Sequence, residues 1–405
     1  MKNKTNTRTS AAGEQPRCAS LFSQILNIVD RAQFDAAVRR TGAENRTKGF
    51  SCWEQFVAMS FCQLAQAKSL REIEEGLACC EGRLRHLGIE EAPARSTLSY
   101  ANRVRPAALF EQVFYSVLGR CQVAAPGHPF RFKNKLLTLD STVLDLCASM
   151  FDWARFRRTK GAAKLHLVLD HDGCLPVFAH VTEAAVADVT IAQQLILPPG
   201  SILAIDRGYI DYRLFEAWSE QKVGFVTRLK QNADYAEMET RLSATEGQIR
   251  RDGLIVFQPI TAGRTITGTY RRIEVWLEDK QETLVLLTNL LDLSAATIAA
   301  IYKQRWQIEL FFKAIKQNLR IKTFVGTSAN AVHIQVWSAL ITILLVKYLQ
   351  FKSRCAWALS HLVALLRWNL FSYRDLWDWL DQPLHTPPLA PPETQLILDS
   401  IIAPA

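Results

Sequence analysis

Short apolar runs of strand character alternate with helical segments in the middle of the chain, and this alternation limits the possible folds more than any other feature of the sequence. The strand-like runs are residues 135–140, 164–170, 174–182, 201–206 and 223–229, and the helical segments are residues 188–197 and 212–220. Asp172 and Gly173, between the second and third runs, are typical of a hairpin turn. Antiparallel strands followed by crossing helices and further strands predict an α/β protein whose mixed sheet is covered by helices.

The flanking segments have a different texture. Residues 18–125 show the apolar spacing of helices, and the turn-rich residues 124–129 end them. Strand-like runs return at residues 254–259, 264–269, 272–277 and 283–288, and helical spacing follows from residue 294 to about residue 371. We therefore predict a disordered start (1–17), a helical accessory domain (18–125), a main α/β domain (130–350) with a β-rich insertion at about 230–290, and C-terminal helices with a loosely packed, acidic, proline-rich tail (351–405).

Charge and cysteine usage narrow the class of protein. The net charge of +9 over 405 residues attracts polyanions such as nucleic acid, although many proteins with small substrates are equally basic. Nine cysteines without a C-x-x-C pair indicate buried free thiols in a reducing cytoplasm. The first twenty residues lack the apolar block of a secretory signal, and the apolar run 336–346 is shorter than the roughly 20 residues that span a bilayer. We expect a cytoplasmic protein without a membrane segment, in which residues 336–346 form a core helix.

One predicted helix of the N-terminal region carries three arginines. Arg95, Arg103 and Arg105 lie in a segment that Ser96 or Thr97 is expected to cap. Such a helix suits a DNA groove, and a solvated amphipathic face explains the same charges equally well.

The segment from Tyr302 to Lys316 holds the most informative set of side chains. In an α-helix, four of its polar residues fall within about 60° of one another around the axis: Tyr302, Arg305, Glu309 and Lys316. Apolar residues at the other positions are expected to anchor the helix: Trp306, Ile308, Leu310, Phe311 and Ile315. A carboxylate on such a stripe binds a divalent cation while its cationic neighbours hold phosphate oxygens. The alternative is a solvated helix on which Glu309 pairs with Lys313.

Two aspartates complete a candidate metal centre. Asp140 and Asp206 each end a strand-like run, which is where a sheet presents side chains to a cleft, although either one alone is typical of a turn or a helix cap. Two bridged divalent ions need two or three carboxylates from separate elements, and Glu309 supplies the third. Phosphodiester transfer suits such a centre, because one ion activates the attacking oxygen and the other stabilises the leaving oxygen.

At these residues the sequence resembles the DDE transposases of bacterial insertion sequences. The likeness is to the branch whose helix carries Tyr, Arg, Glu and Lys at fixed spacing (YREK), and the helix matches that spacing without departure at Tyr302, Arg305, Glu309 and Lys316. Residues 137–142 and 202–209 are similar to the first and second aspartate motifs of the family. The likeness covers about residues 130–350, and residues 18–125 resemble the accessory domain often found ahead of this core.

The resemblance implies an RNase H-like catalytic core that binds Mg²⁺ or Mn²⁺ through Asp140, Asp206 and Glu309. It also implies phosphate contacts at the transposon end, made by Tyr302, Arg305 and Lys316, and base stacking by Trp306. The implied activity is binding of terminal repeats followed by metal-dependent strand cleavage and strand transfer, as in cut-and-paste transposition. The implied partners are double-stranded DNA, both transposon ends and target, and further copies of the chain in a homodimer or higher assembly at the nucleoid.

Further basic residues are candidates for DNA contacts, although charge runs are as typical of a solvated face: Lys160, Lys164, Arg207, Arg228 and Lys230. The remaining aspartates of this region have structural explanations as turn residues, helix caps or neighbours of the proposed ligands: Asp145, Asp170, Asp172, Asp188 and Asp211.

Two other functions fit the same residues. A metal-dependent DNA nuclease hydrolyses DNA without joining a 3′-hydroxyl end to a target, and a non-catalytic repressor derived from a transposase binds DNA only. The repressor hypothesis predicts erosion of the carboxylates or of the Tyr-Arg-Glu-Lys face, and all of these residues are intact.

Overall fold

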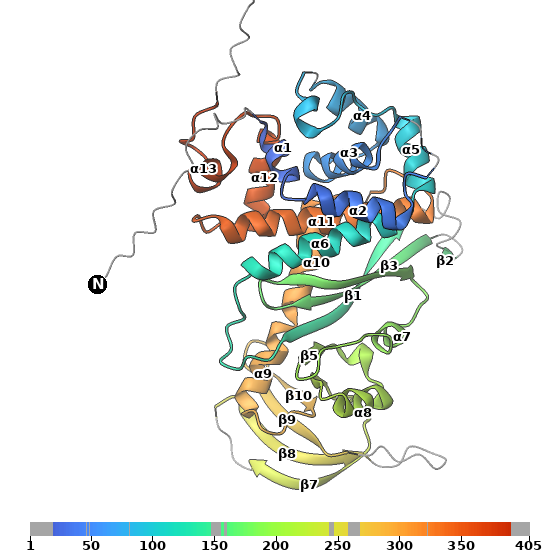
Figure 1. Ribbon diagram of the computed structural model, residues 1–405. Helices are drawn as coiled ribbons and strands as arrows, with labels where there is room; N and C mark the ends of the chain where they lie inside the picture. The colour runs from blue at the N-terminus through green and yellow to red at the C-terminus, as the bar shows by residue number, and fades with distance from the viewer. Residues whose placement is uncertain are drawn as a thin grey trace, which may run out of the picture.

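The computed structural model describes residues 19–45, 47, 49–80, 82–146, 155–157, 160–242, 247–257, 268–321 and 323–389, without the side chains of residues 155–157, 160, 161 and 242. Helices from both ends of the chain gather at one end of the molecule, the sheet crosses its middle, and β7 to β10 lie at the other end (Figure 1). The predicted α/β class with a mixed sheet is confirmed.

The N-terminal region is helical, as its apolar spacing predicts. Its elements are α1 (Leu21–Leu26), α2 (Arg31–Thr41), α3 (Cys52–Ala65), α4 (Leu70–Ala78), the 3-10 helix η1 (Leu84–Leu87), α5 (Arg95–Val104) and α6 (Ala108–Ala124). Ser51 and Glu54 form a capping box at the start of α3. The expected cap of α5 is wrong: the helix begins at Arg95 without a side-chain cap. Arg105 is buried and donates hydrogen bonds to the carbonyl groups of residues 50 and 51, so only Arg95 and Arg103 of the three arginines are exposed.

All described strands belong to one sheet with the order β2-β3-β1-β5-β6-β10-β9-β8-β7, and β4 pairs with β3. The strands are β1 (Leu136–Leu146), β2 (Arg155–Arg157), β3 (Lys160–Asp170), β4 (Leu175–Glu183), β5 (Ile202–Ile205), β6 (Gly224–Arg228), β7 (Tyr235–Leu242), β8 (Ile249–Phe257), β9 (Tyr270–Leu277) and β10 (Glu282–Thr288). β1, β5 and β6 run parallel, and the other pairs are antiparallel. The predicted hairpin of β3 and β4 is confirmed, with Gly173 in the left-handed region at φ 69°.

Three predictions about these elements need correction. β1 does not end at Asp140 but continues to Leu146, because residues 141–146 pair with β3. The helix expected over residues 188–197 is the short α7 (Asp188–Ala192). The strand expected over residues 264–269 lies partly outside the described residues, and residues 268 and 269 are not in a strand. The 3-10 helix η3 (Arg207–Tyr209) and α8 (Tyr212–Glu220) complete this region.

The strands expected as an insertion extend the main sheet. β10 pairs with β6, and β9, β8 and β7 follow in order, so the sheet continues without interruption from the aspartate-bearing strands to its far edge. Arg271 on β9 forms a buried ion pair with Asp252 on β8 and donates to the carbonyl groups of residues 290, 291 and 293. This contact ties the extension to the loop that precedes the next helix.

Helices follow the last strand: α9 (Ala295–Gln304), α10 (Trp306–Asn318), α11 (Ala329–Lys352), α12 (Leu359–Asn369) and α13 (Leu376–Asp381). By length and composition alone α11 is long and apolar enough to cross a membrane, but most of its side chains are buried against α3, α5, α6 and α12. The predicted core helix at residues 336–346 is therefore confirmed. Of the cysteines described, Cys52, Cys62 and Cys121 are buried free thiols as expected, whereas Cys79 is exposed.

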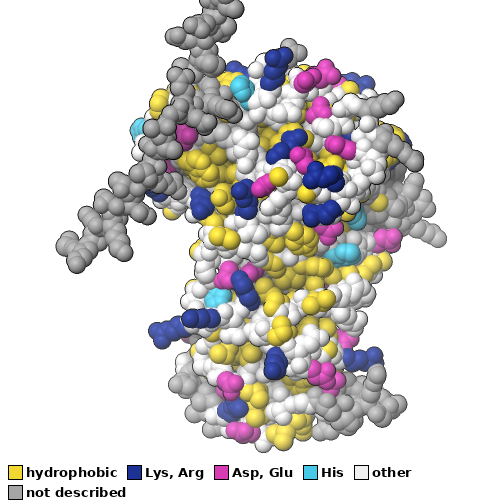
Figure 2. Space-filling model, in the orientation of Figure 1, with side chains coloured by type: hydrophobic (Ala, Val, Ile, Leu, Met, Phe, Trp, Pro, Cys, Tyr) yellow, Lys and Arg dark blue, Asp and Glu magenta, His cyan; other side chains and the backbone are white. Residues whose placement is uncertain are grey.

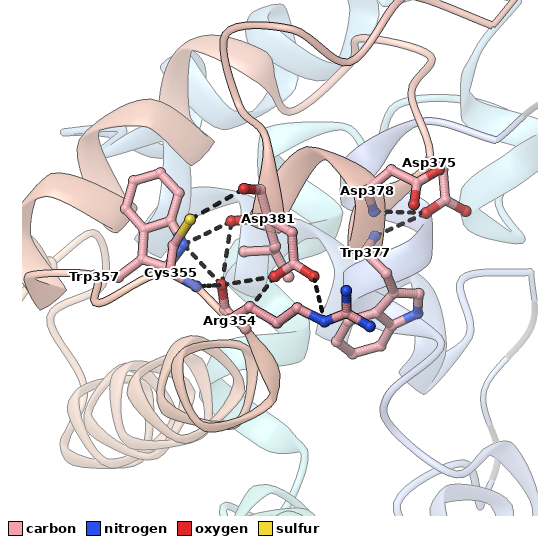
Figure 3. Close-up of polar contacts among 9 residues, drawn as sticks. Arg354, Cys355, Trp357, Asp375, Trp377, Asp378 and Asp381 are labelled. Atoms are coloured by element: carbon pink, nitrogen blue, oxygen red, sulfur yellow. Dashed lines mark hydrogen bonds and ion pairs between the residues drawn. The ribbon is translucent and has the colours of Figure 1, made fainter. Parts of the chain in front are cut away.

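α13, which lies within the segment predicted to be a loose tail, is packed, and residues 390–405 of that segment lie outside the described part of the chain. Asp381 accepts hydrogen bonds from the backbone N–H of Arg354 (2.7 Å) and from Ser353, and the indole of Trp357 donates to the carbonyl of Leu380 (Figure 3). Asp375 caps α13 (Figure 3). Ser20 pairs with Tyr373 in an isolated β-bridge, which fastens α1 to this segment. The large apolar side chains of α13 are buried, and their removal from water explains why this helix packs although the segment is acidic and rich in proline.

Candidate active site

The register of β1 and β5 places Asp140 and Asp206 side by side. The parallel pairing runs from Leu136–Ile202 to Leu139–Ile205, so the two aspartates are the next residues on neighbouring strands. Since side chains alternate between the two faces of a strand, both aspartates belong to the face of Leu136 and Ala204. That face packs against Ile298, Ile301 and Tyr302 of α9 in one apolar cluster. The sheet therefore presents two carboxylates towards the helices that carry the predicted glutamate.

The helix predicted over residues 302–316 is two helices that meet at Arg305. Arg305 follows the last residue of α9 and precedes the first residue of α10. Its dihedral angles stay helical (φ −50°, ψ −31°), so the helix is interrupted but the backbone does not become extended. Ile308, Phe311, Phe312 and Ile315 bury one side of α10. Trp306 and Leu310 do not anchor the helix as predicted, because 55% and 43% of their surfaces are exposed.

Arg305 lies between the carboxylates of two elements. Its Nη2 is 2.7 Å from Oε1 of Glu309, and its Nη1 is 3.6 Å from Oδ2 of Asp140. Burial disfavours the charged guanidinium, but the hydrogen bond that it donates to Glu309 and the charges of Glu309 and Asp206 outweigh this effect, and the pKa of Arg305 is raised. The alternative pairing of Glu309 with Lys313 is not found among the described ion pairs. Glu309 thus faces the aspartates, and the arginine compensates their shared charge.

The carboxylates are close enough to repel one another. Burial raises the pKa of Asp140 to about 6, the backbone N–H of Ser141 and the charge of Arg305 oppose this rise, and the charges of Asp206 and Glu309 add to it. Hard oxygen donors that repel one another suit a divalent cation. Within the described residues, however, no three His, Cys, Asp or Glu side chains already lie close enough to hold a metal ion. The donor chemistry fits such an ion, and the guanidinium of Arg305 now provides the positive charge between two of the three carboxylates.

The other residues of the predicted stripe also reach β1 or its neighbours. Lys316 donates to Oγ1 of Thr142 (2.7 Å) and to the carbonyl of Val143 (2.8 Å). The ring of Tyr302 is buried, and the guanidinium groups of Arg228 and Arg305 each lie 5.9 Å from its centroid. The stripe and Arg228 therefore gather at the same edge of the sheet. Sequence reasoning missed Ser141 and Thr142 as partners in this cluster, although two hydroxyl residues directly after Asp140 gave a signal.

The remaining candidates are distributed more widely. Arg207 in η3 and Lys230 after β6 are exposed, and the side chain of Lys160 is outside the described part of the chain. Lys164 lies on the face of the sheet opposite to Asp140, where it donates to Asp188 (3.2 Å). Lys164 therefore makes a structural contact and lies away from the cluster of Asp140, Asp206 and Glu309.

The other aspartates have partners of their own. Asp170 and Asp172 both accept from Lys135, Asp211 caps α8, and Asp145 is exposed on β1. Asp188 does not cap α7 as expected, because it is the first residue of the helix and Ala187 precedes it.

A family model and curated relatives identify the family of this chain. Residues 131–345 match the model of the transposase DDE domain, and residues 17–90 match a domain of unknown function (DUF4372). The transposase y4zB of Sinorhizobium fredii is 32% identical over 70% of this chain and 80% of its own length. The transposase of insertion sequence element IS5377 from Geobacillus stearothermophilus is 28% identical over 63% of this chain and 67% of its own length. A structure of the piggyBac transposase synaptic complex with hairpin DNA covers 94% of this chain and 83% of that one, at 10% identity and a TM-score of 0.40.

Proposed function

Because this chain belongs to the DDE transposases of bacterial insertion sequences, we propose that it binds the terminal repeats of its element and cuts and rejoins DNA strands there. The observation that supports this chemistry best is the meeting of Asp140 and Asp206, side by side on parallel strands, with Glu309 from α10 through Arg305. The match of the helix to the YREK spacing supports membership of that branch.

In this proposal, Asp140, Asp206 and Glu309 hold Mg²⁺ or Mn²⁺, which supplies activation of the attacking oxygen and neutralisation of charge on the leaving oxygen. Arg305 exchanges its carboxylate partners for a phosphate oxygen when DNA binds, since a guanidinium fits both groups with the same geometry. Lys316 binds β1 at Thr142 and Val143, close to Asp140 in the strand. The ring of Tyr302 contacts the guanidinium of Arg305. Trp306 is proposed to stack on a base, and its exposure at the start of α10 supports this role.

The helical region 18–125 is proposed to be an accessory DNA-binding domain ahead of an RNase H-like catalytic domain at about 130–350. On the exposed side of α5, the guanidinium of Arg103 lies 5.5 Å from the ring of Tyr100, and Arg95 is exposed at the start of the same helix. On the face of the helical end that Figure 2 shows, basic and acidic side chains are interspersed. This favours a few positioned phosphate contacts over broad charge attraction. Assembly on DNA as a homodimer or larger, in the cytoplasm, completes the proposal.

The test is a cleavage and strand-transfer assay on duplexes that carry the terminal repeats, with Mg²⁺. Asp140→Asn, Asp206→Asn and Glu309→Gln each keep the size of the side chain and remove the charge that a metal ion needs. We expect each to lower the cleavage rate roughly a thousandfold, since a bound ion contributes several kcal/mol to stabilisation of the transition state. Asp145→Asn, an exposed aspartate on the same strand, is the matched control and keeps full activity.

Full activity in any of the three variants would exclude that residue as an essential ligand. Cleavage without joining of the 3′-hydroxyl end to target DNA would favour the nuclease alternative. DNA binding without cleavage by the wild type would favour the repressor.

A further inference from the structure

Behind Asp140, on the opposite face of β1, a second polar cluster surrounds Asp188. The parallel pairing of β1 with β5 ends at Leu139, so from Asp140 onward β1 keeps only β3 as its hydrogen-bonded neighbour among the described strands. α7 contacts β1, and Asp188 of α7 bonds with Ser141 on this stretch. Beyond Leu139, β1 has no backbone hydrogen bonds to β5, so side-chain contacts on that side help to hold the strand in place.

Asp188 receives two hydrogen bonds from the sheet. Its Oδ1 accepts from Oγ of Ser141 at 2.8 Å and from Nζ of Lys164 at 3.2 Å, and Lys164 also donates to the carbonyl of Val186 at 2.9 Å. Ser141 on β1 shares this face with Lys164 on β3, because opposite residues of antiparallel strands point to the same side. The first residue of α7 is thus bound to both strands at once.

His166 restricts how the charge of Asp188 is balanced. It is fully buried opposite Ser141, and its Nε2 lies 2.9 Å from Oγ1 of Thr182, which already donates to the carbonyl of Glu183. Burial lowers the pKa of His166 to about 4, so the ring is neutral near pH 7 and does not balance the charge of Asp188. Nδ1 lies 3.5 Å from Oδ1 of Asp188 and makes no hydrogen bond with the described residues. Lys164 consequently supplies the compensating charge, with its Nζ 3.2 Å from the oxygen of Asp188 that accepts from Ser141.

Ser141 connects this cluster to the candidate active site. Its backbone N–H donates to Oδ1 of Asp140 at 2.8 Å, while its side chain is held from the other face of the strand by Asp188. Resting on the proposed function, we infer that Asp188 is a positioning residue for the first catalytic carboxylate: it fixes the peptide of Ser141, whose N–H orients Asp140. Contacts behind a metal ligand of this kind typically change metal affinity about 10- to 100-fold when removed.

The test measures Mn²⁺ binding to the full chain by electron paramagnetic resonance, with DNA affinity measured in parallel by fluorescence anisotropy on a terminal-repeat duplex. Asp188→Ala and Ser141→Ala are expected to weaken Mn²⁺ binding about tenfold and to leave DNA affinity within about twofold. Asp188→Asn, whose amide oxygen still accepts from Ser141, is expected to stay within about threefold of the wild type. Asp145→Asn is the control and binds Mn²⁺ unchanged.

Mn²⁺ affinity equal to the wild type in Ser141→Ala and Asp188→Ala would overturn the inference. So would a loss in Asp188→Asn as large as in Asp188→Ala, because the contact with Ser141 would then be irrelevant. Should Asp188→Ala fail to fold, Ser141→Ala decides alone, since it removes one hydroxyl from a half-buried position. Asp140→Asn separates the two proposals: unchanged Mn²⁺ binding in that variant would reject Asp140 as a ligand, and with it the proposed function.

Discussion

Arg271 and Arg305 each pair with carboxylates, yet they differ in how completely they are paired. Arg271 is 4% exposed, holds both oxygens of Asp252 (2.8 and 2.6 Å) and donates to three backbone carbonyl groups. Arg305 reaches one carboxylate closely and another at 3.6 Å, and its Nε makes no hydrogen bond with the described residues. A guanidinium whose N–H groups all have hydrogen-bond partners stabilises the fold. A guanidinium that lacks some of these partners and lies at a cluster of carboxylates remains able to change partners.

The largest expected difference between the two is in stability. Arg271→Met leaves Asp252 charged and buried without a partner, and is expected to lower the free energy of unfolding by about 3–5 kcal/mol. Arg305→Gln leaves its carboxylates partly exposed to water and is expected to change it by less than about 1 kcal/mol. Urea unfolding followed by tryptophan fluorescence measures both. Equal losses of unfolding free energy in the two variants would show that the number of hydrogen-bond partners does not distinguish a structural arginine from a functional one.

The buried His171, which bonds with the start of β1, is expected to contribute to the pH dependence of stability. Burial, and to a smaller extent the charge of His128, lowers the pKa of His171 to about 4 from 6.5, and its Nε2 bonds with Thr138 at 2.6 Å. Because the unfolded chain then binds the proton more readily, stability is complete above pH 6.5 and is lost as the pH falls towards 4.

Between pH 7 and pH 5, wild type is expected to lose on the order of 2 kcal/mol more than His171→Gln, which cannot titrate. Chemical unfolding at a series of pH values measures the slope. His86→Gln, at an exposed position, should keep the slope of the wild type. An unchanged slope in His171→Gln would place the titrating group elsewhere.

Exposed Trp306 tests whether the neighbourhood of Arg305 meets DNA. Trp306→Ala is expected to weaken binding of a terminal-repeat duplex about tenfold, as loss of base stacking does, and to change the free energy of unfolding by less than about 0.5 kcal/mol. Trp368→Ala on α12, where the side chain is 77% exposed, is the matched control and should bind DNA normally. Equal effects of the two variants on DNA affinity would remove Trp306 from the interface.

The smallest expected effect is a gain in metal affinity. Without DNA, Arg305→Gln removes a positive charge from beside Asp140 and Glu309, and Mn²⁺ binding is expected to tighten about fivefold, as a partly screened charge at this distance implies. Titration calorimetry measures this, with Arg103→Gln on α5 as the control. Weaker Mn²⁺ binding in Arg305→Gln would mean that the guanidinium organises the carboxylates rather than competing for them.

The sequence indicated local features of the site better than distant ones. Tyr302, Arg305, Glu309 and Lys316 share one stripe because helical spacing is a local property, and a one-residue interruption at Arg305 did not remove it. Lys164 shows the opposite case. Lys164 lies on the face of the sheet opposite to Asp140 because of the register between β1 and β3. A shift of one residue would have turned its side chain to the other face, and the local sequence does not reveal this register.

Composition was also a weak guide to packing. The acidic, proline-rich character of the residues beyond Arg374 predicted a loose tail, but Trp379 and Leu380 are buried. Whether such a segment docks depends on an apolar partner surface provided elsewhere in the chain, and that surface is visible only in the folded protein.

The β-bridge between Ser20 and Tyr373 has a consequence for synthesis of the protein. The backbone N–H of Leu21 and of Phe22 donate to the carbonyl groups of Ser372 and Leu370, so α1 is completed by residues that leave the ribosome some 350 positions later. A nascent chain or a prematurely stopped product therefore leaves α1 without this partner. Translation as far as residue 373 is in this way a condition for a finished helical layer.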